Sequence, residues 1–144
     1  MVANPPPDTP RITPYLLYHD VGAALDYLSR VFGFHEKFRM AGPDGKVNHA
    51  EVTLKDGLVM MGSPGGAYRS PKELGGTTQF LYIYVDDVDA HHRTSVQAGA
   101  KILSPPEDQF YGDRRYSAED PEGFQWFFAQ HVREVSEEEI KQHA

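Results

Sequence analysis

The chain has 144 residues, of which 40% are hydrophobic, and a formal net charge of −7. This length suits a single domain, and the acidic balance leaves no broad basic surface for binding nucleic acid. Without cysteine, the chain has no disulfide, thiolate metal site or cysteine nucleophile. It also lacks the apolar core of a signal peptide and a run long enough to span a membrane, so we expect a cytoplasmic protein without membrane contact.

The first half of the chain predicts a strand, a helix and three further strands. Residues 1–10 are rich in proline and predict a flexible arm. Aromatic and β-branched residues then indicate a strand, after which Asp20 is placed to cap a helix that ends at Gly33. Further strands are expected over residues 34–40, 46–56 and 58–62, separated by glycine turns. The predicted first unit therefore covers about residues 11–62.

The second half repeats this order after a glycine- and proline-containing connection at residues 63–77. A strand starts near residue 78, Asp87 is placed to cap the second helix, and Gly99 is placed to end it. Three strands follow, the first of them predicted to be short and broken by two prolines. The predicted second unit covers about residues 78–131. The last three predicted strands are residues 100–108, 113–120 and 124–130.

Together these patterns predict an α+β fold of two tandem βαβββ units within one domain, residues 11–133. Asp20 and Gly57 in the first unit correspond to Asp87 and Gly123 in the second. Residues 134–144 predict a short terminal helix or tail, because a serine is followed three residues later by a glutamate, as in a capping box.

The two βαβββ units and three segments carry a family resemblance. The segments are HDVGAALDYLSRVFGF, VDDVDAHHRTSVQAGA and YGDRRYSAEDPEGFQWFFAQ. Over about residues 12–131 the chain resembles the vicinal oxygen chelate superfamily of glyoxalase I, extradiol dioxygenases and bleomycin-resistance proteins. The resemblance implies a curved mixed sheet around a cleft, but one scaffold of this kind hosts several chemistries.

The resemblance also implies where a metal would bind. Metal-dependent members carry histidine or carboxylate ligands on the first and last strands of each unit. Counting along the chain places Thr13, Met61, Phe80 and Phe127 at these positions. None of the four suits a divalent cation, which prefers carboxylate, imidazole or water ligands. We therefore expect no metal and no other cofactor, as in the bleomycin-resistance branch, whose members are typically homodimers.

Strand alternation predicts an aromatic lining for the cleft. Side chains two residues apart share a face, and aromatic faces with adaptable methionines suit a flat or amphipathic molecule. Of the neighbours Arg114 and Arg115 only one can face inward, where it could pair with a carboxylate or phosphate; we assign Arg114 to this position. The alternatives are a core filled by tyrosines and a surface arginine. The predicted ligand-binding residues are Tyr15, Leu17, Met61, Phe80, Tyr82, Tyr84, Phe127 and Arg114.

One histidine differs from the rest in its setting. His49 and Glu51 alternate with apolar residues on a predicted strand, so they share a polar face. Such a pair could serve as an acid–base couple, and the alternative is a polar stripe facing solvent. The sequence thus predicts metal-independent binding of a small organic molecule, which includes sequestration as in antibiotic resistance. The alternative is a lyase, isomerase or dioxygenase with a shifted metal site or the His49–Glu51 pair.

Overall fold

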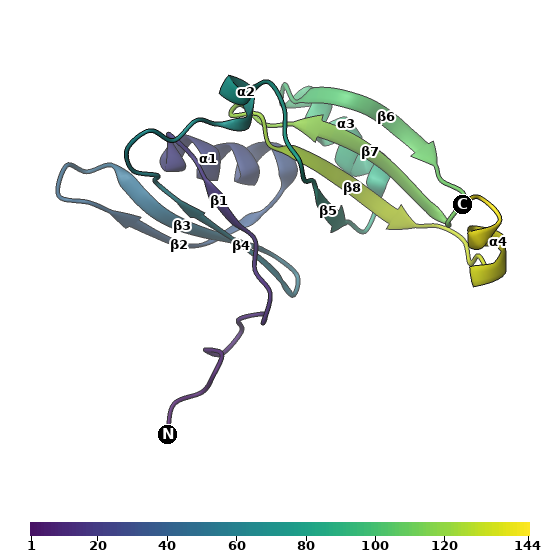
Figure 1. Cartoon of the computed structure of the whole chain (residues 1–144), viewed down its shortest axis with the longest axis horizontal. Helices are drawn as coiled ribbons and strands as arrows, with labels where there is room; N and C mark the ends of the chain where they lie inside the picture. Colours follow the sequence, from purple (N-terminus) through teal and green to yellow (C-terminus); the bar gives the residue numbers. More distant parts are fainter. The chain divides into compact units, whose positions relative to one another are not determined.

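The computed structural model describes residues 1–144 and divides into two compact units, Met1–Ser70 and Pro71–Ala144. Each unit contains one strand, one long helix and three further strands in that order (Figure 1). Each also forms its own open four-stranded sheet with parallel and antiparallel neighbours. The predicted α+β fold with two tandem βαβββ units is therefore confirmed.

The first unit consists of β1 (Tyr15–Leu17), α1 (Val21–Phe32), β2 (His35–Ala41), β3 (Val47–Leu54) and β4 (Gly57–Gly62). Its strands lie in the order β1-β4-β3-β2. β1 is parallel to β4, and the other two pairings are antiparallel. Residues 1–14 form no helix or strand and lead away from this sheet at the amino terminus (Figure 1).

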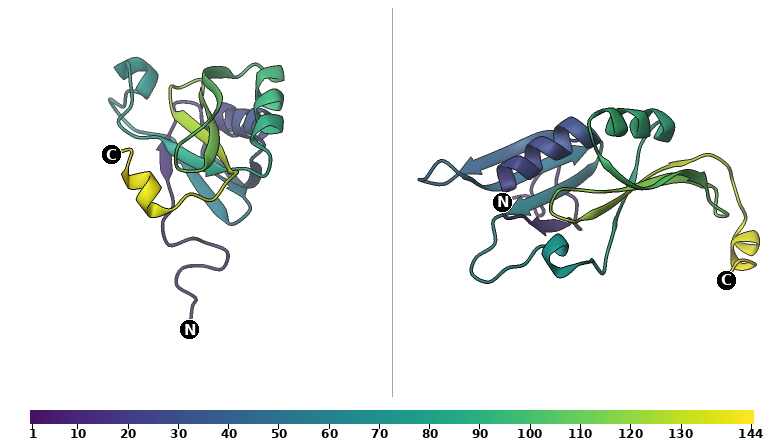
Figure 2. Two further views of the ribbon diagram at one scale, coloured as in Figure 1. Left: turned by 90° about the vertical axis from the view of Figure 1, so that its right-hand side faces the viewer. Right: turned by 90° about the horizontal axis from the view of Figure 1, so that it is seen from above.

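Helix α1 begins and ends where the sequence predicts. The Asp20 carboxylate accepts a hydrogen bond from the Ala23 backbone N–H, and Gly33 adopts a left-handed conformation with φ of 77°. The helix covers one face of the first sheet (Figure 2). Its buried side chains pack mainly against β3, on the face of the sheet that also carries the core residues of β1 and β4, because the apolar positions recur every three or four residues. The buried positions of α1 are Val21, Ala24, Leu25, Leu28, Val31 and Phe32.

The second unit consists of α2 (Pro71–Leu74), β5 (Leu81–Tyr84), α3 (Val88–Gln97), β6 (Lys101–Asp108), β7 (Asp113–Glu119), β8 (Gln125–His131) and α4 (Glu137–Lys141). Its strands lie in the order β5-β8-β7-β6, with β5 parallel to β8. Ser136 caps α4 by accepting a hydrogen bond from the Glu139 N–H. The short helix α2 lies within the segment that the sequence predicts as a loop. No helix is both long enough and apolar enough to cross a membrane.

Helix α3 packs on the second sheet through polar as well as apolar contacts (Figure 2). The Tyr116 hydroxyl lies 2.6 Å from His91 Nδ1 and 2.9 Å from Ser95 Oγ. Trp126 and Phe128 stack beneath the helix with ring centroids 6.4 Å apart, and both are completely buried. Helix α3 is therefore held to its sheet partly by hydrogen bonds, whereas α1 is held by a stripe of apolar side chains.

The structure corrects the expectation for β6. The strand runs without a break through Pro105 and Pro106, with register shifts on both sides of Ser104. β6 is an edge strand, so one of its sides has no neighbour to which backbone N–H groups must donate. Proline is tolerated at such an edge because its missing N–H breaks no interstrand bond there.

Candidate ligand-binding site

Each sheet has one face covered by its helix and one open face. We call them the first open face, opposite α1, and the second open face, opposite α3. Residues paired across strands share a face, so the register assigns each side chain to one of the two. The first open face carries Tyr15, Leu17, Phe38, Met40, His49, Glu51 and Met60, and the second carries Phe80, Tyr82, Tyr84, Arg115, Ser117 and Phe127.

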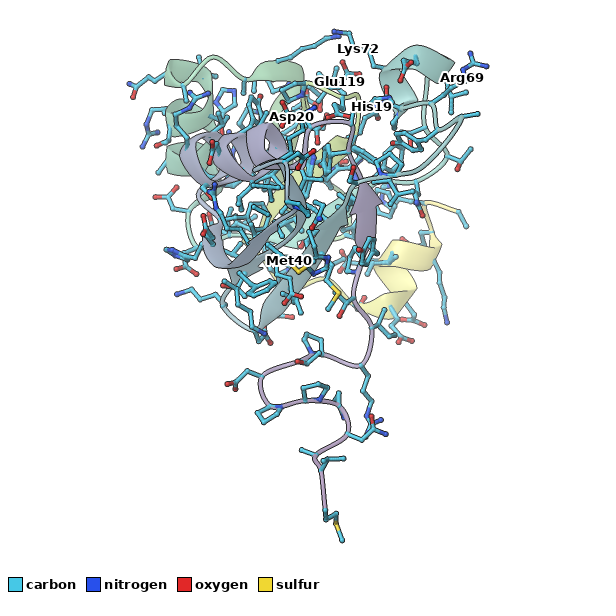
Figure 3. All side chains as sticks on the ribbon, turned by 90° about the vertical axis from the view of Figure 1, so that its left-hand side faces the viewer. His19, Asp20, Met40, Arg69, Lys72 and Glu119 are labelled. Atoms are coloured by element: carbon cyan, nitrogen blue, oxygen red, sulfur yellow. The ribbon has the colours of Figure 1, made fainter.

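A hydrogen-bonded chain of three side chains crosses the first open face. The Tyr15 hydroxyl lies 3.0 Å from His49 Nδ1, and His49 Nε2 lies 2.9 Å from Glu51 Oε2. A carboxylate only accepts, so Nε2–H donates to Glu51, and in the neutral imidazole Nδ1 then accepts from the Tyr15 hydroxyl. Met40, labelled in Figure 3, flanks this chain from β2. The predicted pairing of His49 with Glu51 on one polar face is therefore present.

Gly62 allows Tyr15 to reach His49. The Tyr15 ring lies across β4 directly over Gly62, which is the cross-strand partner of His49. A Cβ atom at position 62 would clash with the Tyr15 hydroxyl and ring. The glycine thus permits a contact between β1 and β3, which are not adjacent in the sheet.

The predicted orientation of Met61 is wrong. Met61 has 0% exposure and pairs with Leu16 and Ala50, which also face α1, whereas Met60 pairs with Tyr15 and Glu51 on the open face. The error arises from the turns. The β3–β4 turn has two residues between paired positions and places Gly57 inside β4, whereas the longer β7–β8 turn places the equivalent glycine before β8. Counting four residues from each glycine therefore reaches the open face in the second unit, at Phe127, but the helix-covered face in the first unit, at Met61.

The second open face is an aromatic surface. Phe127 contacts Phe80 with ring centroids 4.9 Å apart in an edge-to-face arrangement, and it stacks on Tyr82 at 6.1 Å. Tyr82 in turn contacts Tyr84 at 5.6 Å. Tyr82 is 39% exposed and Tyr84 58% exposed, so ring surface remains accessible. The structure brings together these four predicted residues, as strand alternation indicates.

Of the two neighbouring arginines, Arg115 lies on this aromatic face. Its guanidinium carbon is 4.6 Å from the centroid of Phe127 and 5.9 Å from that of Tyr111. Arg114 points to the helix side, where it forms ion pairs of 3.1 Å with Asp89 and Asp108. The selection of Arg114 as the ligand-facing arginine is therefore wrong. Gln130, the residue that pairs with Arg114 on β8, also faces α3. Arg114 therefore lies on the helix-covered face of the sheet and not on the open face.

A buried carboxylate orders one end of the second open face. Asp113 is only 2% exposed, and its Oδ2 accepts hydrogen bonds from the Tyr82 and Tyr84 hydroxyls at 2.7 and 2.8 Å. Its Oδ1 accepts a third bond, from His131 Nδ1 at 2.7 Å. The Tyr111 hydroxyl lies 3.3 Å from that of Tyr82 and donates to it, because the Tyr82 proton is directed to Asp113.

These bonds shift the titration of all four groups. Burial acts to raise the pKa of Asp113, but the bonds from His131, Tyr82 and Tyr84 outweigh it and lower the pKa. Burial, followed by the bonds to Tyr111 and Asp113, raises the pKa of Tyr82. The bond to Asp113 raises the pKa of Tyr84 and that of His131. Asp113 is therefore ionised at neutral pH, and both tyrosines are neutral donors to it.

Sequence reasoning missed Asp113 and His131, and of the two candidate arginines it favoured Arg114 over Arg115. Asp113 and Arg115 are two positions apart on β7, so they lie on the same face of the sheet. β7 pairs with β8, which carries Phe127, and aligning the two strands outward from their connecting turn would have placed both residues on the face of Phe127. No local pattern signals the bond from His131 to Asp113, because the two residues lie at the paired ends of different strands.

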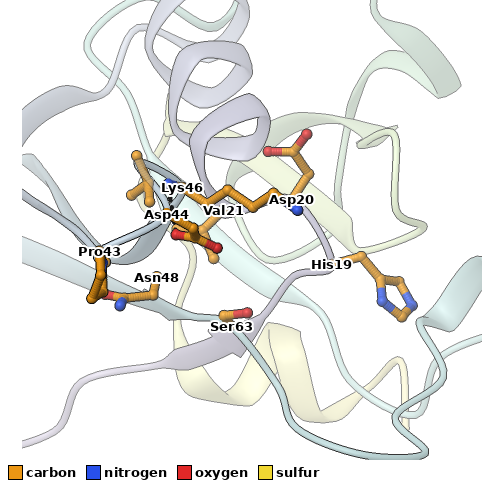
Figure 4. Close-up of a pocket in the computed structure, with 10 residues that line it drawn as sticks. His19, Asp20, Val21, Pro43, Asp44, Lys46, Asn48 and Ser63 are labelled. Carbon is orange, nitrogen blue, oxygen red and sulfur yellow. Dashed lines mark hydrogen bonds between the residues drawn. The ribbon is translucent and has the colours of Figure 1, made fainter.

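A pocket of about 620 Å³ lies elsewhere in the first unit, beside the start of α1 and the β2–β3 turn (Figure 4). Its polar groups include Asp20 and Asp44, which accept backbone hydrogen bonds from Ala23 and Lys46. These carboxylates therefore cap a helix and close a turn. The pocket contains none of the predicted ligand-binding residues.

The sequence matches a family model. Residues 11–128 match that of the Glyoxalase/Bleomycin resistance protein/Dioxygenase superfamily. The chain belongs to this superfamily. Its βαβββ repeat and its pairing of first with last strand in each unit agree with the resemblance seen in the sequence.

The chain is also similar to individual proteins of Mycobacterium, Micromonospora and Streptomyces. Mb0911c of Mycobacterium bovis, an uncharacterized protein, is 36% identical over 137 residues, which cover 92% of this chain and 90% of that protein. The crystal structure of TioX from Micromonospora sp. ML1 is 35% identical and covers 86% of this chain and 100% of its own, with a TM-score of 0.71. TnmS3, an antibiotic binding protein from Streptomyces sp. CB03234, is 21% identical with a TM-score of 0.62; it covers 86% of this chain and 100% of its own, and shows the same fold.

The residues at the expected metal positions do not fit a divalent cation. The Thr13 hydroxyl donates to the Pro10 carbonyl, Met61 is buried against α1, and Phe80 and Phe127 have no donor atom. The chain has no group of three histidine, aspartate or glutamate side chains arranged to hold a metal ion.

Proposed function

We propose that the protein binds a small aromatic or amphipathic organic molecule on the second open face without using a metal. The observation that carries this proposal is the cluster of Phe80, Tyr82, Tyr84 and Phe127, which exposes ring surface beside Arg115. Exposed aromatic surface of this kind marks a binding face, because rings gain from stacking as well as from leaving water.

The face is ordered before any ligand arrives. Asp113 holds the Tyr82 and Tyr84 hydroxyls, and Phe127 is held between Phe80 and Tyr82. Rings fixed in this way lose little conformational entropy on binding, so more of the contact energy contributes to affinity. Binding without catalysis requires no additional functional group on this face. We propose sequestration of the ligand, as in antibiotic resistance, as the biological role of the protein.

Two observations support this proposal. TnmS3 is described as an antibiotic binding protein, so the shared fold is compatible with binding of a small molecule. The expected metal positions carry Thr13, Phe80 and Phe127, and Met60 holds the open-face position for which the sequence predicts Met61; none of these side chains suits a divalent cation, which supports binding that is independent of metal.

The test uses 2-naphthamide, a flat neutral probe, titrated into the isotopically labelled protein and followed by NMR. We expect shift changes at Tyr82, Tyr84 and Phe127, and Phe127→Ala should weaken binding by about tenfold, as loss of a stacking ring does. Val96→Ala removes an exposed apolar side chain of α3 and is the control that should leave affinity unchanged. Shift changes confined to other surfaces, or an unaltered affinity of Phe127→Ala, would exclude the second open face.

The Tyr15–His49–Glu51 chain favours a second candidate function, an isomerase that moves a proton. Tyr15 could accept a substrate proton while passing its own to His49, which Glu51 would stabilise as the cation. Returning the proton to another substrate atom completes the isomerisation without a co-reactant. Keto–enol exchange of phenylpyruvate tests this candidate. Acceleration that His49→Gln abolishes would support it, and a rate equal to that of buffer would exclude it for this probe.

A further inference from the structure

We propose that the second open face selects aromatic molecules that carry an anionic group, and that Arg115 binds this group. The inference rests on the proposed function, because it specifies the chemistry of the ligand that the face binds. A carboxylate, sulfonate or phosphate attached to a ring has the required form, since all three accept parallel N–H bonds from one guanidinium.

Arg115 is available for such a bond. Its contacts within the second unit are with the rings of Phe127 and Tyr111, and no carboxylate lies within ion-pairing distance. Glu107 on β6 is its backbone partner, yet the guanidinium lies over Phe127 and forms no ion pair with Glu107. Stacking over a ring occupies the flat face of the guanidinium and leaves its edge, which carries the N–H groups, free to donate.

The other cations of this face, His131 and Lys101, already have carboxylate partners. Asp113 accepts three hydrogen bonds, one of them from His131, and Glu119 pairs with Lys101 at 2.8 Å. Arg115 is therefore the cation that a ligand on these rings would meet. Contact with Phe127 and Tyr111 also limits the positions that the side chain samples, which reduces the entropy cost of binding.

The tyrosines cannot substitute for Arg115. The hydroxyl protons of Tyr82 and Tyr84 are directed to Asp113, and that of Tyr111 is directed to Tyr82. These hydroxyls offer only oxygen lone pairs to a ligand, and lone pairs repel an anion. Arg115 is therefore the residue that distinguishes an aromatic ligand with an anionic group from a neutral one.

The test compares 2-naphthoate with its neutral counterpart 2-naphthamide by isothermal titration calorimetry at low salt. We expect the wild-type protein to bind 2-naphthoate about tenfold more tightly, as one charge-assisted bond allows. Arg115→Gln should bind both probes with the weaker affinity. Raising the salt concentration should reduce the preference of the wild-type protein, because mobile ions screen a charge at the surface.

Arg114→Gln is the matched control. It removes the same charge from the adjacent residue of β7, but on the side that faces α3, so the preference for 2-naphthoate should remain. A preference that survives in Arg115→Gln, or that both variants lose equally, would overturn the proposal. Circular dichroism would establish that each variant is folded. If 2-naphthamide binds and 2-naphthoate binds no more tightly, the anion preference fails alone; if neither probe binds, the proposed function fails with it.

Discussion

Asp113 illustrates how a single residue organises the second open face. Its carboxylate is buried at the start of β7, and three donors from β5 and β8 surround it. An ionised group in that position would destabilise the fold if it lacked partners. With them, the same charge fixes the direction of two tyrosine hydroxyls that a ligand would meet.

The bond between Asp113 and His131 predicts a pH dependence of stability. Because the pKa of Asp113 is lowered in the folded protein, its ionised carboxylate adds to the free energy of unfolding above pH 3.8, its ordinary pKa. This contribution is lost as pH falls through the lowered pKa. The raised pKa of His131 means that its contribution is complete below 6.5 and is lost as pH rises through the raised pKa. The pair should therefore stabilise the protein most between these two values.

The measurement is the denaturant midpoint of unfolding as a function of pH. Wild-type stability should decline above about pH 6.5 in excess of the decline in His131→Asn, whose amide can donate to Asp113 without titrating. Because the His131 side chain is 44% exposed, solvent screening should keep this difference small. Identical pH profiles for the two proteins would show that the pair does not contribute.

Substitutions of Trp126 and Phe127 should differ in how much they destabilise the protein. Trp126 is completely buried and donates its indole N–H to Asp120 at 3.1 Å, so Trp126→Ala should cost about 3 to 5 kcal/mol in free energy of unfolding. Phe127→Glu should cost only about 1 to 2 kcal/mol, because a carboxylate there reaches water and lies beside Arg115. Chemical denaturation compares the variants, and a larger loss for Phe127→Glu would contradict the assigned faces.

At the scale of elements, both long helices have an aspartate N-cap but pack on their sheets differently. Asp20 and Asp87 each accept a hydrogen bond from the backbone N–H three residues later. Beneath the caps, α1 presents six buried apolar or small residues, whereas α3 buries only Val88 and Ser95. The polar contact of His91 with Tyr116 compensates for part of this difference.

We expect both caps to contribute similarly to stability. Asp20→Ala and Asp87→Ala should each lower the free energy of unfolding by about 0.5 to 2 kcal/mol, the usual range for loss of an N-cap. Asp20→Asn and Asp87→Asn keep an accepting oxygen and should recover most of the loss. Asparagine variants as unstable as the alanine variants would show that the caps act through charge and not through the hydrogen bond.

At the scale of the whole molecule, the expected metal positions predict how the protein responds to chelation. Because those positions hold no suitable ligands, prolonged dialysis against EDTA should leave the thermal midpoint and the affinity for 2-naphthamide unchanged. Scanning calorimetry and calorimetric titration measure the two quantities. A fall in either that added divalent metal restores would contradict metal-independent binding. The homodimer stays a prediction, and light scattering of the purified protein tests it directly.

Local patterns in the sequence were sufficient for the repeat of strand, helix and three strands. Helix caps and the spacing of apolar residues depend on neighbours within a few positions, so Asp20, Asp87 and Gly33 could be placed without a structure. Alternation likewise placed Tyr82, Tyr84 and Phe127 on one face, because their strands contain no irregularity.

The tertiary structure alone decided which residue of each close pair reaches a ligand. A strand of period two changes face with a shift of one residue, and the difference in length between the β3–β4 and β7–β8 turns supplied that shift for Met60 and Met61. Arg115 reaches the rings because β7 pairs with β8 in a register that turns Arg114 toward α3. The partners of Asp113 are 29 and 31 residues away for the tyrosines and 18 for the histidine, distances at which only strand pairing brings side chains together.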